Sequence, residues 1–348
     1  MNVVTIVGAR PNFIKAALVS LELKRNGVDE FMVHTGQHYD AGLSSQIFND
    51  LKIKLPDLNL NVGSGSHAEQ TGKMLIEIEK VLLVQKPDAV VVYGDTNSTL
   101  AGALAGVKLK IPIVHIEAGE RSFDKSMPEE INRIICDHIA KVNCCATKDA
   151  VINLKNEGIK EGVFWTGDVM LDLIKKMANA AKQPIDKIPS RFILFTLHRA
   201  ENTDNRIRLT KTISALAKID FSIVWPMHPR TGKMMAKFNI NFPNNIIVIP
   251  PVSYTEMLWL ISHSYRVATD SGGIQKESYW LGTPCVTLLK KTPWPQTLKS
   301  GWNQEVWDGI ELLSEKLFLK PRGKSNVRQF GEGDAAKKIF QSILYVKQ

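Results

Sequence analysis

Short apolar runs rich in β-branched residues alternate with amphipathic stretches along the whole chain. Parallel sheets buried on both faces are built from continuous apolar strands joined by helices, so this alternation predicts an α/β protein. The expected strands are Val3–Val7, Phe31–His34, Asp88–Tyr93, Ile113–Ile116, Phe192–Thr196, Ser222–Pro226, Ile246–Ile249, Arg266–Thr269 and Cys285–Leu288. The expected helices include Asn12–Lys24, Ala68–Val84, Ser98–Leu109, Glu129–Ile139, Arg206–Ala217 and Tyr254–Ser262.

The length of the chain and a restart of its pattern both indicate two domains. Chains of 348 residues usually divide into domains of ordinary size rather than form one core. The alternation begins again near Gly167, and a connector with Pro and Lys follows at Lys182–Pro189. We expect one domain at residues 1–167, a second at 168–333, and a terminal helix at 334–348 that can pack back on the first.

Composition and charge narrow the class of protein. The chain is 44% hydrophobic and 23% charged, as soluble globular proteins are, and no stretch approaches the roughly 20 apolar residues that span a bilayer. No basic segment precedes the first apolar run, so we expect a cytoplasmic protein without a signal peptide or a membrane partner. A net charge of +9 suits an anionic ligand, while the lack of an aromatic ladder or a basic helix argues against nucleic acid.

The four cysteines form no pattern typical of metal binding or disulfides. They include no CxxC pair, and two of them lie together in an expected buried strand. We expect reduced residues of the core, at Cys136, Cys144, Cys145 and Cys285. No metal and no other cofactor is predicted.

The first candidate for chemistry is the turn after the first strand. Open parallel sheets bind ligands beyond the carboxyl ends of their strands, where loops lead into helix N-termini. Gly8 permits a tight turn there, and Arg10 and Lys15 add positive charge for a phosphate. The segment lacks GxGxxG, which argues against a dinucleotide. An ordinary turn with two surface cations is the alternative.

Several carboxylates follow strands in the first half of the chain. Asp95 follows the strand at 88–93, and Glu117 lies at the end of the next strand. Glu129 and Glu130 open a helix shortly afterwards. Carboxylates that converge on one rim repel one another, which raises some of their pKa values into the range that suits acid/base catalysis. As alternatives, Asp95 can cap a helix and the two glutamates can complement a helix dipole, the role expected for Glu130.

The second half carries candidate donors for a phosphate. His198 and Arg199 stand together on a loop after a strand, although a solitary His is more often structural. His228 and Arg230 form a weaker version of the same His and Arg arrangement after the next strand. We expect His228 to support the residues that contact the ligand without contacting it.

The segment after the strand at 266–269 is the sharpest of these signals. Gly272 and Gly273 at a helix start expose N–H groups to a diphosphate, and Ser271 adds a hydroxyl donor. Glu277 lies further along the helix, where a carboxylate can accept both ribose hydroxyls. Ser-Gly-Gly before a helix is common by itself, so Glu277 is what favours a nucleotide sugar.

An ordered set of motifs resembles the non-hydrolysing UDP-N-acetylglucosamine 2-epimerase family. The motifs span almost the whole chain and read Gly-Ala-Arg-Pro, Thr-Gly-Gln-His, Gly-Asp-Thr-Asn-Ser-Thr, His-Ile-Glu-Ala-Gly, Pro-Glu-Glu-Ile-Asn-Arg, His-Arg-Ala-Glu-Asn and Asp-Ser-Gly-Gly-Ile-Gln-Lys-Glu. The resemblance implies a GT-B architecture, in which two Rossmann-like domains with doubly wound parallel sheets hold the active site in the cleft between them.

The resemblance also implies roles for individual residues. The catalytic set is Asp95, Glu117, Glu129, His198 and Lys15. Asp95 and Glu117 are assigned as the principal acid/base pair, with Glu129 assisting. The residues expected to bind the UDP-sugar are Arg10, Lys15, Arg133, His198, Met257, Ser271, Gly272, Gly273 and Glu277. Among these, Met257 is expected to pack against the uracil.

The implied reaction inverts C2 of the sugar. The C2 proton is removed while UDP leaves C1, which gives a glycal intermediate, and UDP then adds back with a proton on the other face. A C2–H that is not next to a carbonyl is weakly acidic, so cationic donors must stabilise the departing diphosphate. The expected product from UDP-N-acetylglucosamine is UDP-N-acetylmannosamine, for surface polysaccharide synthesis by a homodimeric enzyme.

Two segments depart from the family's pattern. The family's regulatory substrate site uses Gln-His-x-Gln and a following Arg, where this chain has Gln37–Asp40 and Thr71–Lys73, so activation by a second substrate molecule is doubtful. After the strand at 285–288 the family usually carries Thr-Glu-Arg-Pro-Glu or Thr-Glu-Trp-x-Glu, and this chain has Pro293 and Gln296 at the two acidic positions. Trp294, Thr-Asn-Ser after Asp95 and Phe123 resemble the branch that acts on UDP-2,3-diacetamido-2,3-dideoxy-glucuronate, which favours that sugar as the substrate.

Two alternatives of other classes stay open at this point. A GT-B glycosyltransferase would explain the nucleotide-binding second domain, but it would not require the three carboxylates of the first. A nucleotide-sugar-binding protein without turnover would keep the ligand site, and the intact carboxylate set argues against it.

Overall fold

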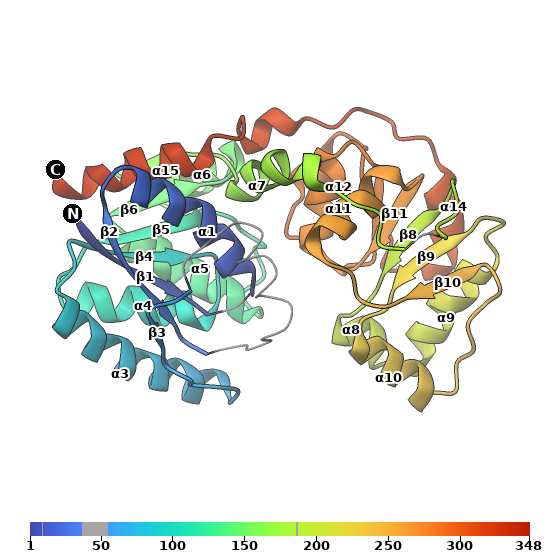
Figure 1. Cartoon of the computed structure of the whole chain (residues 1–348), viewed down its shortest axis with the longest axis horizontal. Coiled ribbons are helices and arrows are strands. Elements are labelled where there is room, and N and C mark those ends of the chain that lie inside the picture. Colours follow the sequence, from blue (N-terminus) through green and yellow to red (C-terminus); the bar gives the residue numbers. More distant parts are fainter. Residues whose placement is uncertain (9, 37–54, 186) are drawn as a thin grey trace. The chain divides into compact units, whose positions relative to one another are not determined.

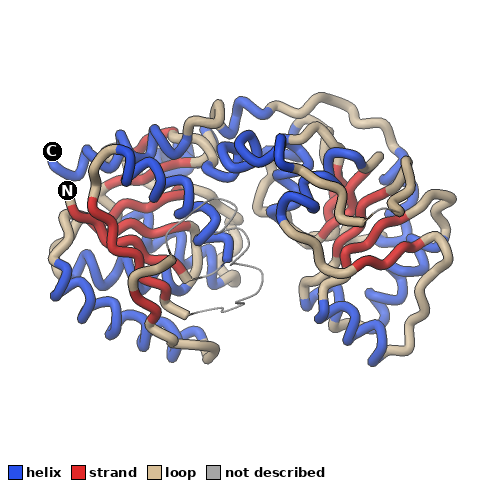
Figure 2. The backbone as a smooth tube through the Cα atoms, in the orientation of Figure 1, coloured by secondary structure: helices blue, strands red, loops and turns tan. Residues whose placement is uncertain are grey.

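The computed structural model describes residues 1–8, 10–36, 55–185 and 187–348 (Figure 1). The chain forms two compact units, Met1–Lys175 together with Arg328–Gln348, and Lys176–Val327. In each unit a parallel sheet lies between layers of helices (Figure 2). The predicted α/β class with two doubly wound sheets is confirmed.

The first unit is built around a seven-stranded sheet in the described part of the chain, with the order β3-β2-β1-β4-β5-β6-β7. Its strands are β1 (Asn2–Val7), β2 (Asp29–His34), β3 (Leu58–Asn59), β4 (Ala89–Tyr93), β5 (Ile113–Ala118), β6 (Val142–Cys145) and β7 (Val163–Trp165). Its helices are α1 (Arg10–Arg25), α3 (His67–Gln85), α4 (Asn97–Lys108), α5 (Pro128–Ile139), α6 (Lys148–Asn156), α7 (Val169–Met177), α15 (Ala335–Ile343) and the short 3₁₀ helices η3 (Val327–Phe330) and η4 (Leu344–Lys347), of which α7 and η3 cross into the second unit.

Alternate residues of β1 feed two separate cores. Val3 and Val7 pack with side chains of α1 and α15 on one face of the sheet. Val4 and Ile6 pack with α3, α4 and α5 on the other. This period of two is what a central strand covered on both faces requires. Close packing of α4 depends on Gly106, where an added Cβ would come within 2.5 Å of the Ile113 side chain.

The C-terminal helix belongs to the first unit. α15 lies beside α1 in Figure 1, and its buried side chains, among them Ile339 and Ile343, join the core of that unit. Asp172 on α7 accepts a hydrogen bond from the backbone N–H of Ala336 at 2.9 Å. Because these contacts hold α7 and α15 together, the compact unit extends to Lys175, beyond the boundary expected at Gly167.

The second unit contains a six-stranded sheet among the residues described, with the order β10-β9-β8-β11-β12-β13. Its strands are β8 (Ile193–Thr196), β9 (Ile223–Pro226), β10 (Ile246–Ile249), β11 (Arg266–Thr269), β12 (Cys285–Thr287) and β13 (Gln304–Glu305). Its helices are η1 (Ala178–Ala180), α8 (Ala200–Thr203), α9 (Arg206–Ala217), α10 (Pro229–Lys237), α11 (Tyr254–His263), α12 (Gly272–Trp280), α13 (Gln296–Lys299), η2 (Ile310–Leu312) and α14 (Leu313–Phe318).

Each sheet reverses its strand order at one point. The reversal falls between β1 and β4 in the first unit and between β8 and β11 in the second. Doubly wound sheets bind ligands beyond the carboxyl ends of the strands at such a point, because the loops there diverge and leave a crevice. The loops after these four strands are therefore where each unit is built to hold a ligand.

Candidate active site

In the first unit, Lys15 and Glu117 form an ion pair next to the point of reversal. The Lys15 ammonium on α1 donates to the Glu117 carboxylate at the end of β5, and both side chains are largely buried, with 13% and 12% exposed. β5 shifts register between Ile116 and Ala118, and Glu117 has a φ of 68°. Bulges of this kind re-aim a side chain, and a non-glycine residue with positive φ costs about 1–3 kcal/mol. The chain thus accepts strain where it presents this carboxylate.

Asp95 follows β4, the strand next to β5 in the sheet, and has a cation of its own. Its carboxylate accepts from the Arg133 guanidinium, and its backbone carbonyl accepts from Asn132 Nδ2 at 2.9 Å. Burial lowers the pKa of Arg133, but Asp95 and Glu130 outweigh burial and raise it, so the guanidinium stays charged. The predicted acids Asp95 and Glu117 therefore lie at neighbouring strand ends, each beside a fixed positive charge.

The two glutamates at the start of α5 differ. Glu129 is exposed and makes no ion pair with any described residue. Glu130 is buried and accepts the backbone N–H groups of Ser122 at 2.9 Å and Phe123 at 2.7 Å, besides a contact of 3.0 Å from Arg133. Glu130 therefore does more than complement the helix dipole, because it closes the loop that follows β5.

Other predicted residues of the first unit are placed only in part. Arg10 is the first residue of α1, at the end of the segment that follows β1, but its side chain is not among those described. The expected change at Gln37–Asp40 lies outside the described residues. Lys73 lies on the exposed face of α3 and donates to Glu69 at 2.7 Å.

In the second unit, a buried aspartate holds the loop that carries His198. The Asp270 carboxylate lies just after β11 and is 0% exposed. It accepts the backbone N–H groups of His198 at 3.0 Å and Arg199 at 2.8 Å, and the side-chain amide of Asn202 at 3.1 Å. It also lies 3.0 Å from His198 Nδ1, while the imidazole is 40% exposed. Asp270 thus orients the ring and leaves Nε2 available for a ligand.

The start of α12 lies beside this pair, on the same side of the sheet reversal. Ser271 is its N-cap and accepts the backbone N–H of Ile274 at 3.4 Å, so its hydroxyl proton can still be donated. Gly272 and Gly273 form the first turn of the helix, where N–H groups have no helical partner. The second unit therefore places His198 and the start of α12 after two paired parallel strands, β8 and β11.

Glu277 and Met257 lie deeper in the second unit. Glu277 is on α12 with 6% of its surface exposed. Met257 is on α11, partly buried against the core that contains Leu260 and Val267. The two residues therefore lie on neighbouring helices, α11 and α12.

The altered loop at Thr292–Gln296 packs against α12. Thr292 Oγ1 donates to Gln275 Oε1 at 2.6 Å and accepts the backbone N–H of Trp294 at 3.0 Å. A Cβ added at Gly272 would lie 3.4 Å from the Trp294 indole nitrogen. The Lys276 ammonium lies 3.5 Å from the centre of a Trp294 ring, at cation–π distance. The loop thus borders the predicted diphosphate end of the site.

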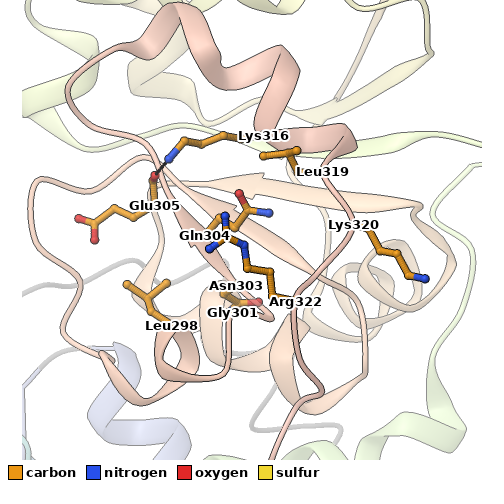
Figure 3. Close-up of a pocket in the computed structure, with 9 residues that line it drawn as sticks. All are labelled: Leu298, Gly301, Asn303, Gln304, Glu305, Lys316, Leu319, Lys320 and Arg322. Atoms are coloured by element: carbon orange, nitrogen blue, oxygen red, sulfur yellow. Dashed lines mark hydrogen bonds between the residues drawn. The ribbon is translucent and has the colours of Figure 1, made fainter.

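A separate cavity of about 310 Å³ lies beside edge strand β13 (Figure 3). Lys316 donates across it to the backbone oxygen of Glu305 at 2.7 Å. Its lining includes none of the predicted site residues and consists of Leu298, Gly301, Asn303, Gln304, Glu305, Lys316, Leu319, Lys320 and Arg322.

Sequence reasoning missed the buried residues that support the site. It did not assign Asp270, whose partners lie about 70 positions earlier in the chain, nor Asn132. It also passed over His115 and Asp137, which lie 2.7 Å apart in the first unit. Asp270 directly follows a strand, and this position could have identified it from the sequence. His115 lies within a strand and Asp137 within a helix, so neither has such a position.

Among the helices that the structure describes, none combines the length and apolar character needed to cross a membrane. The same part of the chain holds no group of three or more His, Cys, Asp and Glu side chains arranged to bind a metal ion.

The chain was compared with known proteins. A family model described as UDP-N-acetylglucosamine 2-epimerase matches residues 21–344. A UDP-N-acetylglucosamine 2-epimerase homolog of Methanococcus maripaludis is 47% identical over 99% of this chain and 99% of its own length. A UDP-2,3-diacetamido-2,3-dideoxy-D-glucuronate 2-epimerase of Pseudomonas aeruginosa is 44% identical, again over 99% of both chains.

Solved structures agree with the sequence comparison. The UDP-GlcNAc 2-epimerase of Methanocaldococcus jannaschii, in complex with UDP-GlcNAc and UDP, is 40% identical with a TM-score of 0.85, covering 99% of this chain and 100% of that one. The predicted GT-B fold class is confirmed by this likeness. The glycosyltransferase VinC has a TM-score of 0.52 at 14% identity over 99% of this chain and 96% of its own, a likeness of fold alone. The family match and these relatives show that the chain belongs to the UDP-N-acetylglucosamine 2-epimerase family.

Proposed function

We propose that this protein is a non-hydrolysing epimerase that inverts C2 of a UDP-2-acetamido sugar, with UDP-N-acetylglucosamine as substrate and UDP-N-acetylmannosamine as product. One observation carries the proposal. Asp95 and Glu117 lie at the carboxyl ends of adjacent strands, and each has its own cation, Arg133 and Lys15. Two such carboxylates suit a reaction that removes a proton on one face of a carbon and returns one on the other.

The proposed chemistry divides into elimination and addition. A carboxylate takes the C2 proton, the C1–O bond breaks with its electron pair going to UDP, and a C1–C2 double bond forms. UDP then adds back at C1 while an acid delivers a proton to the opposite face of C2. Asp95 and Glu117 supply the base and the acid, and the neighbouring cations keep each side chain in place between the steps.

The second unit is proposed to hold UDP. His198, oriented by Asp270, and the N–H groups at the start of α12 would stabilise the negative charge on the departing diphosphate. Arg10 would join them, Glu277 would bind the ribose, and Met257 the uracil.

A related substrate is the second candidate. The P. aeruginosa relative is named for UDP-2,3-diacetamido-2,3-dideoxy-D-glucuronate. The loop at Thr292–Gln296 has lost both family carboxylates, and a Lys276–Trp294 pair borders Gly272 instead. A site with fewer negative charges suits a sugar that brings a carboxylate of its own.

Incubation with each UDP-sugar in deuterium oxide, followed by NMR, tests the proposal. The expected result is an epimerised product with deuterium at C2 from at least one of the two sugars. A glycosyltransferase would transfer the sugar with its C2 hydrogen retained, and a binding protein would leave the substrate unchanged. Retention of the C2 hydrogen with both sugars would therefore refute the epimerase.

Several finer predictions from the sequence stay predictions. They are the assistance of Glu129, the loss of activation by a second substrate molecule, the homodimer, the cytoplasmic location and the role in polysaccharide synthesis.

A further inference from the structure

A fully buried histidine lies behind the two paired acids. His115 is on β5, two residues before Glu117, and is 0% exposed. Its Nδ1 lies 2.7 Å from Asp137 Oδ1, and its Nε2 lies 2.7 Å from the backbone oxygen of Gly94. The proposed chemistry gives this residue no role.

The partners of the His115 ring determine where its protons lie. A carbonyl oxygen can only accept, so Nε2 carries a proton. Asp137 also accepts from the backbone N–H of Gly119 at 3.1 Å and pairs with Arg121 at 2.7 Å. Burial raises the pKa of Asp137, but His115 and Arg121 outweigh burial and hold the pKa below its ordinary value. At 2.7 Å one proton lies between Nδ1 and the Asp137 carboxylate, so both ring nitrogens are held by hydrogen bonds.

The Nε2 bond fixes the peptide that leads to Asp95. Gly94 precedes Asp95 and has a φ of 66°. A Cβ added at Gly94 would lie 3.5 Å from Glu117 Oε2 and 3.6 Å from Lys15 Nζ, so this backbone borders the ion pair. The carbonyl of Asp95 is held separately by Asn132. His115 therefore holds the turn that carries Asp95 and lies against Glu117.

Asp137 extends the same anchorage to the end of β5. Its Oδ2 accepts from Gly119, two residues after Glu117. Gly119 has a φ of 79°, and an added Cβ there would come within 2.5 Å of the backbone oxygen of Ala150. One buried pair thus contacts the backbone beside each acid.

We propose that His115 and Asp137 form a buried hydrogen-bonded pair that positions Asp95 and Glu117 for epimerisation. Neither side chain touches the reacting atoms, because both act through the backbone at Gly94 and Gly119. The kinetic consequence rests on the proposed function, whereas the hold of the pair on the two turns does not.

Steady-state kinetics test the role in turnover. His115→Gln and Asp137→Asn keep a polar side chain but cannot satisfy both sides of the arrangement. We expect kcat to fall about 100-fold, as for a displaced catalytic group, with KM changed less than about threefold. The loss should combine less than multiplicatively with that of Asp95→Asn, because both act on one group. An unchanged kcat, or fully multiplicative losses, would overturn the inference.

NMR tests the arrangement without reference to activity. In protein labelled with ¹⁵N, Nε2 of His115 should carry a proton at neutral pH, and a ring without a proton on Nε2 would overturn the inference. His115→Gln should shift the backbone amide signals of residues 94–97 and 117–119.

His34→Gln, a substitution of another buried histidine in the same sheet, is the matched control and should leave those signals in place. Equal shifts in the two variants would also count against the proposal. If the wild type shows no epimerisation while these signals behave as expected, the proposed function fails and the anchorage stands.

Discussion

The Asp270→Asn substitution probes how the second unit prepares His198. One carboxylate oxygen, Oδ2, accepts from Arg199 at 2.8 Å and Asn202 at 3.1 Å, and the other, Oδ1, faces His198 Nδ1 at 3.0 Å. An asparagine replaces one oxygen by an N–H donor. If the new donor takes the Oδ2 position, two buried donors lose their acceptor. If it takes the Oδ1 position, the proton on His198 must move from Nδ1 to Nε2.

The second arrangement costs less free energy, because it leaves no buried donor without an acceptor. In this arrangement the buried donors bond to a neutral acceptor instead of an ionised one. Because hydrogen bonds to charged groups contribute about 1.5–3 kcal/mol and neutral ones about 1, the free energy of unfolding should fall by about 1–3 kcal/mol. Moving the proton to Nε2 also changes the tautomer that faces the ligand. Loss of the partner that fixes a histidine tautomer lowers turnover steeply, and we expect kcat to fall about 100-fold or more.

Urea unfolding followed by tryptophan fluorescence is the measurement for stability, since every tryptophan except Trp165 lies in the second unit. Asp204→Asn is the matched control. Asp204 is about half exposed and pairs with Arg230 at 2.5 Å, so its loss should cost at most about 1 kcal/mol. If Asp270→Asn unfolds like this control and keeps a normal kcat, the carboxylate does not act as described.

The same aspartate gives a prediction for acid stability. Burial raises its pKa, but His198 and the backbone donors outweigh burial and hold the pKa below the ordinary value. A carboxyl group with a lowered folded pKa contributes stability above its unfolded pKa of about 3.9, and this is lost as the pH falls through the folded value. The difference in unfolding free energy between wild type and Asp270→Asn should therefore shrink below about pH 4. A difference that stays constant from pH 7 to acid would contradict this.

Three further predictions concern the first unit and the cysteines. Asp95→Asn and Glu117→Gln should each lower kcat by several orders of magnitude with an unchanged circular dichroism spectrum, and near-normal rates in both would refute the acid/base assignment. Arg133→Met should leave two carboxylates without their cation and lower the unfolding free energy by about 3–5 kcal/mol in thermal denaturation, and a loss under about 1 kcal/mol would show that the pair is solvated. The four buried cysteines should react with a thiol reagent only after unfolding, because burial raises the pKa of Cys144 and Cys285 to about 12, and reaction of the folded protein at pH 8 would contradict this.

Most of the sheet architecture could be predicted because central parallel strands are buried on both faces. Val3–Val7 and Val267–Thr269 are continuous runs of apolar or small residues, and each overlaps an observed strand. The edge strands β3 and β13 are two residues long and only partly buried, so they carry no such run. Hydrophobic periodicity reports burial, and it fails where a strand is short and half covered.

The site was predictable where position alone implies function. Asp95, His198 and Ser271 follow strands β4, β8 and β11, which border the points of reversal, and Glu117 lies near the end of the next strand, β5. The contacts that hold them depend on which strands become neighbours, which spacing along the chain does not reveal. Asp270 reaches His198 across 72 positions because β8 and β11 pair in the sheet.

The two units supply different parts of the proposed reaction, and this bears on how the substrate could change. The acids and their cations belong to the first unit, where a buried network around Asp137 holds their backbone. The loop at Thr292–Gln296 belongs to the second unit and contacts Gly272 and Lys276, at the end proposed to bind the diphosphate. A change in this loop can therefore alter which sugar is accepted without disturbing the acids that act on C2. Under this division, restoring both family glutamates, at Pro293 and Gln296, should change the preference between the two UDP-sugars while leaving C2 exchange in place, and a variant that lost exchange with both sugars would show that the loop also takes part in the chemistry.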